Sequence, residues 1–158
     1  MARVHPAILL GSVLLIACAK EDPVQDLILP DTCGSNGARM EATVGGNDWC
    51  ANAHVQGMGS DGTAILTGVS LSGGTMVLEV DTLSTGVRPI SEATNSVLYT
   101  SMEGSYTVPA DGHGTLTLTD YDPTSGRLKG TASVGLRLNG DGVAKQVELS
   151  FDVTVGPQ

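Results

Sequence analysis

Basic residues are scarce in this chain. Its 158 residues include 8 Lys and Arg against 17 Asp and Glu, which gives a formal net charge of −9 at pH 7. Lys and Arg side chains that neutralise phosphates supply most of the non-specific affinity of proteins for nucleic acid. Because an acidic chain without a basic patch repels phosphate backbones, the composition excludes nucleic acid as a partner.

Aromatic residues are fewer still, with one Trp, three Tyr and one Phe. Five rings leave little surface on which sugar rings could stack, so glycan binding is disfavoured. Trp49 is expected in the core, because it alternates with Asp48 and Cys50 and shares a strand face with Ala51, Ala53 and Val55.

Long apolar runs are also missing. The apolar stretch Ala7–Ala19 holds 13 residues and follows a short basic opening at Met1–Arg3. A helix that spans a bilayer needs roughly 20 apolar residues. A basic start and a short apolar run are typical of a secretory signal peptide, which we assign to residues 1–17.

The apolar run ends in Leu15-Ile16-Ala17-Cys18, which resembles the lipobox of bacterial lipoproteins. The resemblance implies cleavage before Cys18, a diacylglycerol on its thiol and further acylation, for example with palmitate, of the new N-terminus. Two or more acyl chains, each CH₂ contributing ~0.8 kcal/mol when buried, hold a protein stably on a membrane. An ordinary cleaved signal and a short uncleaved anchor are the alternatives.

The residues after the lipobox bear on the destination. Ala19-Lys20-Glu21-Asp22 resembles a signal that sends lipoproteins of one phylum of Gram-negative bacteria to the outer face of the outer membrane. The alternative is a solvated, acidic start of a tether. We therefore expect a lipid-anchored protein of the outer membrane, with the cell surface as a further expectation.

The mature chain divides into two parts. Residues 18–37 are polar and acidic, with Pro23, Pro30 and the cluster Cys33–Gly37, and are expected to form the lipidated Cys18 and a flexible tether. Residues 38–158 alternate between apolar and polar side chains and are punctuated by glycine turns, as expected of a single folded domain.

The alternation predicts an all-β domain. Val147–Val155 places its valines, Leu149 and Phe151 on one face, and Leu128–Leu138 forms a second such segment. Other predicted strands are Arg39–Val44, Asp48–Val55, Thr63–Leu71, Thr75–Leu83, Ser96–Met102, Gly104–Val108 and a segment around Leu116 and Leu118. About eight or nine antiparallel, hairpin-connected strands suit either a sandwich or a small flattened barrel.

Two segments of this domain carry a family resemblance. Met40–Trp49 resembles the first hairpin of a family of small uncharacterised exported lipoproteins, in which Met-x-Ala-x-aliphatic-x-Gly-x-x-Trp recurs. Gly114–Thr119, Asp122 and Leu128–Thr131 resemble its closing hairpin. Gly45, Ala132 and Val134 depart from the family pattern. The resemblance implies an exported β domain of unknown role.

Cysteine is rare, with three residues in the chain. Once lipid has modified Cys18, an even pair remains, Cys33 and Cys50, and an exported chain in an oxidising envelope favours a disulfide between them. Two free thiols, one of them a metal ligand together with His54, are the alternative.

Residues that could perform chemistry are scattered. Cys50, Asn52 and His54 could begin a metal site, but His113 stands alone and no second ligand cluster accompanies them. Asp120 and Asp122 have the spacing of calcium ligands within a segment that also suits an ordinary hairpin turn. We therefore expect no metal and no cofactor.

No catalytic motif is found either. Gly68–Ser72 lacks the last glycine of a nucleophile elbow, and the six glutamates follow no catalytic pattern. The prediction is a non-enzymatic binding or structural module that meets an envelope protein or ligand. The alternative is a lipocalin-like carrier of a small hydrophobic ligand, for which small inward residues such as Gly130 and Ala132 would leave a cavity.

Overall fold

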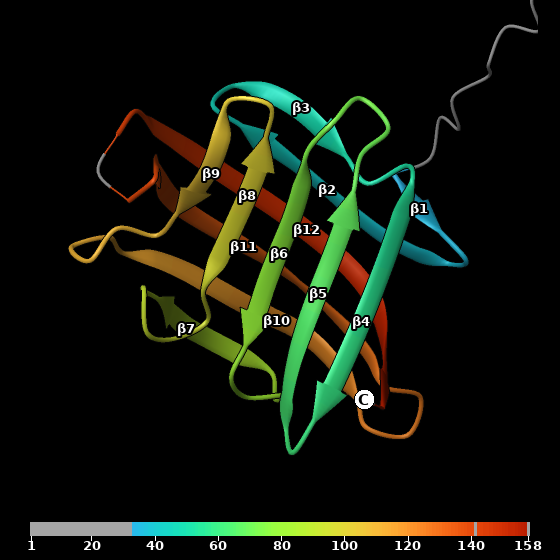
Figure 1. Ribbon diagram of the computed structural model, residues 1–158. Coiled ribbons are helices and arrows are strands. Elements are labelled where there is room, and N and C mark those ends of the chain that lie inside the picture. Colours follow the sequence, from blue (N-terminus) through green and yellow to red (C-terminus); the bar gives the residue numbers. More distant parts are fainter. Residues whose placement is uncertain (1–32, 141, 158) are drawn as a thin grey trace, which may run out of the picture.

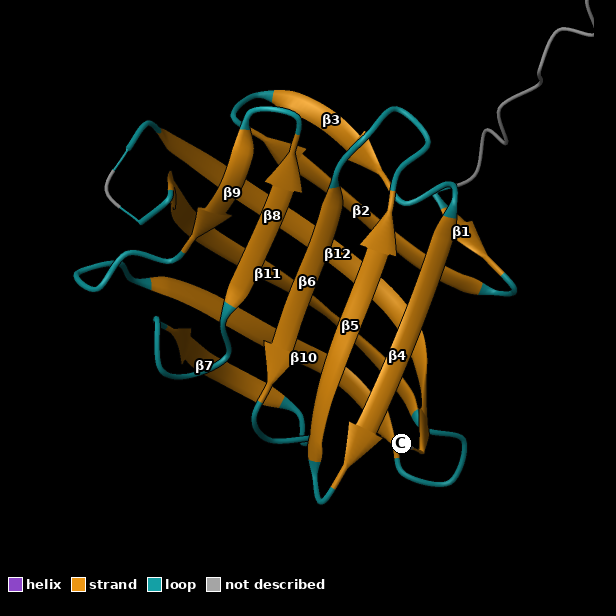
Figure 2. Ribbon diagram, in the orientation of Figure 1, coloured by secondary structure: helices purple, strands orange, loops and turns teal. Residues whose placement is uncertain are grey.

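The computed structural model describes residues 33–140 and 142–157, and within them every regular element is a β-strand (Figures 1 and 2). The all-β prediction is thereby confirmed. The described part holds twelve strands rather than eight or nine. They are β1 (Gly34–Ser35), β2 (Ala38–Val44), β3 (Asn47–Cys50), β4 (His54–Ser60), β5 (Thr63–Val69), β6 (Thr75–Val80), β7 (Gly86–Ile90), β8 (Val97–Ser101), β9 (Gly104–Thr107), β10 (Gly114–Asp122), β11 (Arg127–Leu138) and β12 (Ala144–Pro157).

The strands form two layers that run across each other (Figure 1). Strands β4, β5, β6, β8 and β9 make the front layer, and β2, β12, β11, β10 and β7 make the back layer. Successive strands of the front layer pair antiparallel. The apolar faces of the two layers meet between them, as in an orthogonally packed β domain.

Two long strands join the layers into a closed ring. β12 pairs with β11 and β2 along its length and, at its end, pairs in parallel with β4, where Val155 lies opposite Gly57. β11 pairs with β10 and, at its own end, with β9, where Arg137 lies opposite Thr107. The fold is therefore a small flattened barrel, and the parallel pairing of β12 with β4 departs from the all-antiparallel arrangement that we expected.

The turns explain how short segments can reverse so often. Asn36–Gly37 and Asp61–Gly62, the two-residue connections of β1 to β2 and of β4 to β5, each have two consecutive residues at positive φ, between 51° and 83°. This is the backbone of the type I′ turn, which matches the twist of the strands it joins and favours Asn or Asp followed by Gly. The Asn36–Gly37 turn joins β1 to β2, so the folded domain includes residues 33–37, which we had assigned to the tether.

The core lies between the layers and confirms the predicted faces of β11 and β12. Val147, Leu149, Phe151 and Val153 are all buried, and so is Trp49, whose side chain is 6% exposed. The space beside Gly130 is filled, because a Cβ built there would lie 2.8 Å from Phe151 Cζ and would clash with the carbonyl oxygen of Thr117.

The predicted strands depart from the structure in two places. The segment Asp48–Val55 is not continuous, since β3 ends at Cys50 and β4 begins at His54, and the three residues between them carry the chain from the back layer to the front. β7 was not predicted at all. It lies at the edge of the sheet, pairs only with β10 and contains Pro89, a residue that edge strands tolerate.

Candidate functional site

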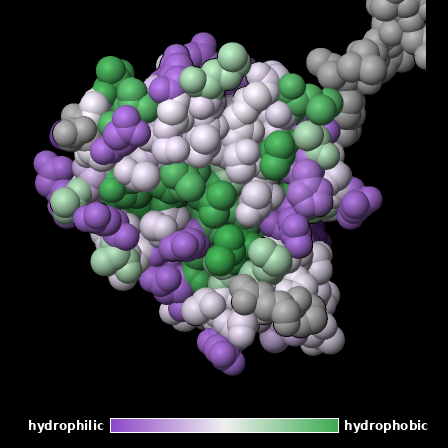
Figure 3. Space-filling view, viewed as in Figure 1, coloured by the Kyte–Doolittle hydropathy of each residue, from purple (hydrophilic) through white to green (hydrophobic). Residues whose placement is uncertain are grey.

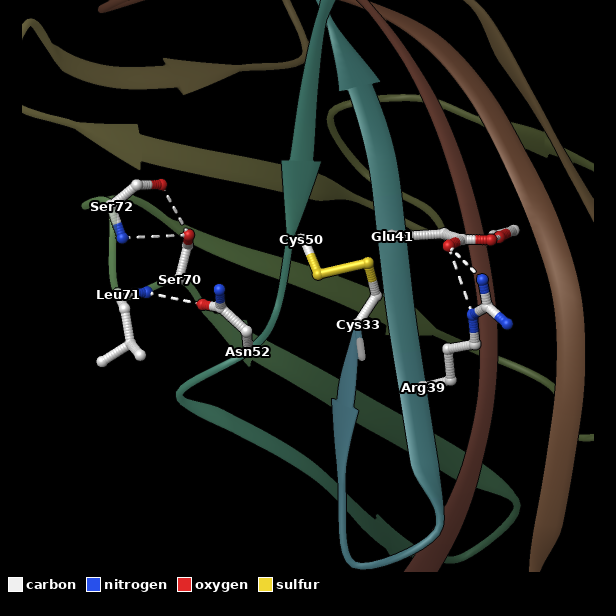
Figure 4. Close-up of a disulfide and its surroundings, with 9 residues drawn as sticks. Cys33, Arg39, Glu41, Cys50, Asn52, Ser70, Leu71 and Ser72 are labelled. Carbon is white, nitrogen blue, oxygen red and sulfur yellow. Dashed lines mark hydrogen bonds and ion pairs between the residues drawn. A yellow bond between two sulfur atoms is a disulfide. The ribbon is translucent and has the colours of Figure 1, made fainter. Parts of the chain in front are cut away.

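The predicted disulfide between Cys33 and Cys50 is present, with their Cα atoms 4.8 Å apart (Figure 4). β1 and β3 lie end to end along the same edge of β2, since Gly34 is opposite Arg39 and Cys50 is opposite Glu41. The bridge therefore closes the joint of one interrupted edge strand. This joint is also where the chain that precedes Cys33 enters the described fold.

Backbone hydrogen bonds hold both sides of the joint. Met40 N–H donates to the carbonyl oxygen of Cys33 at 2.9 Å, and Ala51 N–H donates to the carbonyl oxygen of Met40 at 3.0 Å. The side-chain oxygen of Asn52 then accepts the Leu71 N–H at 2.9 Å (Figure 4). Asn52 thereby fixes the crossing to the front layer.

A groove of about 710 Å³ lies beside the disulfide on the outside of the back layer. Its polar lining residues alternate along the strands with buried ones such as Ala42 and Leu149, which places the groove outside the core. A neighbouring hollow of about 350 Å³ continues it across β12 and β11. The groove is lined by Cys33, Glu41, Ala42, Thr43, Asp48, Trp49, Cys50, Thr131, Glu148, Leu149 and Ser150.

The first carboxylate of this groove is held in place by its neighbours. Arg39 donates to Glu41 Oε2 at 2.6 Å, and the Ser150 hydroxyl donates to Glu41 Oε1 at 3.1 Å. The hydrogen bond from Arg39, and secondarily that from Ser150, holds the pKa of Glu41 below its ordinary value, against the opposing effect of its partial burial. Glu41 is thus an ionised acceptor near neutral pH and unsuited to act as a general acid.

The second carboxylate is organised in the same way. Glu148 Oε1 accepts the Ser133 hydroxyl at 2.8 Å and the Gln146 amide at 2.9 Å. Asp48, on the far side of the groove, is exposed. The groove therefore presents prearranged acceptors and hydroxyls, which suit hydrogen bonding to a polar or cationic ligand.

Cys50, the first ligand of the hypothetical metal site, cannot bind a metal ion as a thiolate, because its sulfur is bonded to that of Cys33. His54 is exposed on β4 and its Nε2 lies 3.3 Å from Gln56 Oε1. His113 lies in the loop before β10 and is exposed. Within residues 33–140 and 142–157, no three His, Cys, Asp or Glu side chains come close enough together to hold a metal ion.

The two aspartates with calcium-like spacing have different surroundings. Asp122 accepts the Thr124 N–H at 2.8 Å and the Ser125 hydroxyl at 2.7 Å, which makes it the capping residue of the β10–β11 turn. These bonds, with that from Ser125 the stronger, hold the pKa of Asp122 below its ordinary value. Asp120 is exposed and lies at the irregularity where β10 shifts register against β11.

The lipidation residue, Cys18, and the predicted signal peptide and acidic tether up to Thr32 lie outside the described residues. Among the residues that the structure describes, no helix is long and apolar enough to cross a membrane.

Comparisons of the chain with protein-family models, with curated proteins and with solved structures found no match. The resemblance of Met40–Trp49 to small exported lipoproteins therefore stays a prediction.

One feature of the front layer was missed from the sequence. Ile65, Val77 and Leu98 stand on its outer face, on three neighbouring strands, although the outer face of a half-exposed sheet is normally polar. The signal was present as short apolar runs that break the alternation, among them Met76-Val77-Leu78 and Val97-Leu98-Tyr99. Such runs indicate that both faces of a strand are apolar.

Proposed function

We propose that this protein is a lipoprotein of the outer membrane, anchored through lipid on Cys18, whose β domain is a non-enzymatic binding or structural module. The observation that carries the proposal is the disulfide. It joins two of the three cysteines of the chain, and the third is Cys18, at the end of the apolar run. A disulfide also suits an oxidising compartment outside the cytoplasm, to which a signal peptide would direct the chain.

The position of the bridge supports a mechanical role in anchoring. A lipid anchor at Cys18 transmits any pull on the membrane through the chain to Cys33. There the disulfide and the Met40–Cys33 hydrogen bond pass the load to β2 and β3 rather than to a fraying end. The bridge thus connects the tether to β2 and β3.

The interior favours a module over a carrier. A carrier needs an apolar cavity for its ligand. The inward position at Gly130 is occupied by the ring of Phe151, and Ala132 is 2% exposed within the same packed core. The groove of about 710 Å³ lies outside the barrel, and its lining includes the hydroxyls and carboxylates of Glu41, Glu148 and Ser150. Recognition at the outer surface is therefore the function that we propose.

The test of the anchor is Cys18→Ala in the full chain, expressed in a Gram-negative host. We expect the parent protein to incorporate an alkyne-labelled palmitate and to stay with membranes after a carbonate wash. The variant should lose the label and move to the soluble fraction, because it lacks the thiol that receives diacylglycerol. Cys33→Ser/Cys50→Ser is the matched control, since it removes two cysteines but keeps the lipobox, and whatever protein is made should remain labelled and membrane-bound.

Two outcomes would contradict the anchor. One is a Cys18→Ala protein that stays as firmly bound to membranes as the parent, and the other is a parent protein that carries no acyl label. Outer-membrane fractions and protease treatment of intact cells then distinguish periplasmic from surface-facing molecules.

A further inference from the structure

An apolar stripe crosses the exposed face of the front layer. It consists of Met58 on β4, Ile65 on β5, Val77 on β6 and Leu98 on β8, and Figure 3 shows a hydrophobic band across the middle of this face. Met58 lies opposite Ile65, and Val77 lies opposite Leu98. Ile65 and Val77 are diagonal neighbours, because Ile65 pairs with Glu79 and Thr67 pairs with Val77. The stripe is therefore continuous over four strands, a span of about 14 Å.

The stripe ends in a hollow of about 300 Å³. Val77 and Leu98 border this hollow together with the buried side chains of Val97 and Val108. Other side chains of the same face are mostly Thr and Ser, so the apolar residues are concentrated rather than scattered. A concentrated apolar patch with a polar rim is typical of an interaction site.

The rim of the hollow is acidic. Glu79 and Glu92 both border it and both are exposed. Glu79 accepts a hydrogen bond from the Ser96 hydroxyl at 2.7 Å, and neither carboxylate takes part in an ion pair among residues 33–140 and 142–157. Arg137 is the basic residue in register with this row, but it lies on β11 opposite Thr107, three strands beyond Val77. The charge beside the hollow is therefore left uncompensated.

We propose that the apolar stripe binds an amphipathic, basic helix of a partner protein. Its apolar side chains, three or four residues apart, would cover the stripe, while Lys or Arg at its flank would meet Glu79 and Glu92. A second copy of this chain fits less well, because it would bring the same two carboxylates toward each other. An anionic lipid surface is disfavoured for the same reason. This inference rests on the proposed role as a binding module and specifies its surface.

The test uses the full chain, purified from membranes and placed in nanodiscs of neutral lipid. The probe is a fluorescein-labelled peptide of about 14 residues, long enough to cross the stripe as a helix, with Leu at i, i+3, i+4 and i+7 and Lys opposite. A second peptide carries Glu in place of Lys. Fluorescence anisotropy measures binding, and empty nanodiscs report binding to lipid.

The variants separate the two parts of the site. Val77→Thr/Leu98→Thr removes the apolar floor with residues that strands accept, and Glu79→Gln/Glu92→Gln removes the charge. Val87→Thr is the matched control, because Val87 is 71% exposed on β7, in the opposite layer. Thermal melts monitored by circular dichroism establish that each variant is folded.

We expect the Lys peptide to bind saturably, and Val77→Thr/Leu98→Thr to raise its Kd about tenfold or more, equivalent to ~1.4 kcal/mol. Glu79→Gln/Glu92→Gln should weaken binding and reduce its dependence on salt, while Val87→Thr leaves it unchanged. Equal binding of the Glu peptide, equal effects of the stripe and control variants, or binding to empty nanodiscs would overturn the proposal. So would a dimer of the parent, seen by sedimentation, that the stripe variant abolishes. The protein in these nanodiscs is already membrane-anchored, so a negative result counts against this surface and leaves the lipid anchor standing.

Discussion

At the scale of single residues, Trp49 shows that alternation along a strand can correctly place a side chain in the core. It is 6% exposed, as its strand face predicts. Its Nε1–H is buried with no hydrogen-bond partner among the described residues. A buried polar group without a partner costs roughly 1–3 kcal/mol. Trp49 therefore stabilises the domain through the burial of its large apolar surface.

Gly130 shows where the same kind of reasoning failed. A small inward residue suggested a cavity, but neighbouring atoms occupy the space, with Phe151 Cζ 2.8 Å from where a Cβ would stand and the Thr117 carbonyl oxygen also in contact with it. Gly130→Ala should lower the free energy of unfolding by about 1–3 kcal/mol, the usual cost of overpacking a core. Urea unfolding followed by fluorescence of Trp49 measures the change.

The matched control for this substitution lies on the same strand. At Gly135 the nearest atom to a built Cβ is Gln146 Oε1, 3.8 Å away. Gly135→Ala should be neutral or slightly stabilising, since it meets no clash and restricts the unfolded chain. If Gly130→Ala were tolerated as well as Gly135→Ala, the core around Phe151 would be looser than the structure has it, and the carrier hypothesis would gain support.

At the scale of elements, the strands that could be predicted are those with a long, uninterrupted alternation. β11 and β12 alternate over most of their length, and the pattern locates both. β7 could not be predicted, because Gly86–Ile90 shows no alternation and includes Pro89. β3 and β4 were merged, because the sequence alternation of Trp49, Ala51, Ala53 and Val55 continues through the crossing between the layers, where Ala53 is exposed rather than buried.

The candidate sites also differ in how far the sequence could predict them. The disulfide was predictable from the number of cysteines and the register of Trp49, which are both local properties. The groove beside it brings together Glu41, Thr131 and Glu148 from β2, β11 and β12. The stripe requires four strands to pair in one particular register. Sequence patterns do not specify which strands become neighbours, so neither surface could be derived from them.

The disulfide leads to a prediction at this scale. Cys33→Ser/Cys50→Ser should lower the free energy of unfolding by about 3 kcal/mol in the chain-entropy model, because the bridge closes a loop between residues 17 positions apart. Urea unfolding measures the loss. Hydrogen exchange should show the Met40 and Ala51 amides, which flank the joint, to be the most affected.

Reduction of the parent protein with dithiothreitol is the independent check, since it opens the bridge without changing the sequence. It should reproduce the lower stability of the double variant. Unchanged stability in both experiments would mean that β1 is held by its pairing with β2 and by the hydrogen bond from the Val55 N–H to the Ser35 hydroxyl, without help from the bridge.

At the scale of the whole molecule, closure of the barrel depends on contacts between distant parts of the chain. Met40 on β2 lies opposite Phe151 on β12, and the parallel pairing of β12 with β4 completes the ring. Pairing segments that are so distant in sequence costs loop-closure entropy before any stabilising contact forms. Such topologies are therefore slow to fold. The topology depends on β12, which pairs with β11, β2 and β4. The alternation of its side chains does not show which strands these three partners are.

The charges of the whole domain are mostly unpaired, and the described residues contain three ion pairs. The one that joins β11 to β12 is bidentate, with Arg127 Nε 2.8 Å from Asp152 Oδ1 and the Arg127 terminal nitrogen 2.6 Å from Oδ2. Its hydrogen bonds, opposed by partial burial, hold the pKa of Asp152 below its ordinary value. Because protonation of Asp152 removes this pair, its contribution to stability can be tested by lowering the pH.

Asp152→Asn should lower the free energy of unfolding at pH 7 by up to about 1 kcal/mol, because the pair is solvent-exposed and screened. The folded pKa of Asp152 is lowered, so its contribution is complete above the unfolded value of about 3.9 and disappears as pH falls through the folded pKa. Urea unfolding of parent and variant from pH 7 down to about pH 2 should therefore show a difference in the free energy of unfolding that disappears only below about pH 3.9.

Arg127→Gln should give a similar difference at pH 7. The double variant should lose less stability than the sum of the two single losses, because both substitutions remove the same interaction. A gap that persists unchanged at the lowest pH would mean that Asp152 stabilises the β11–β12 pairing by packing rather than by its charge.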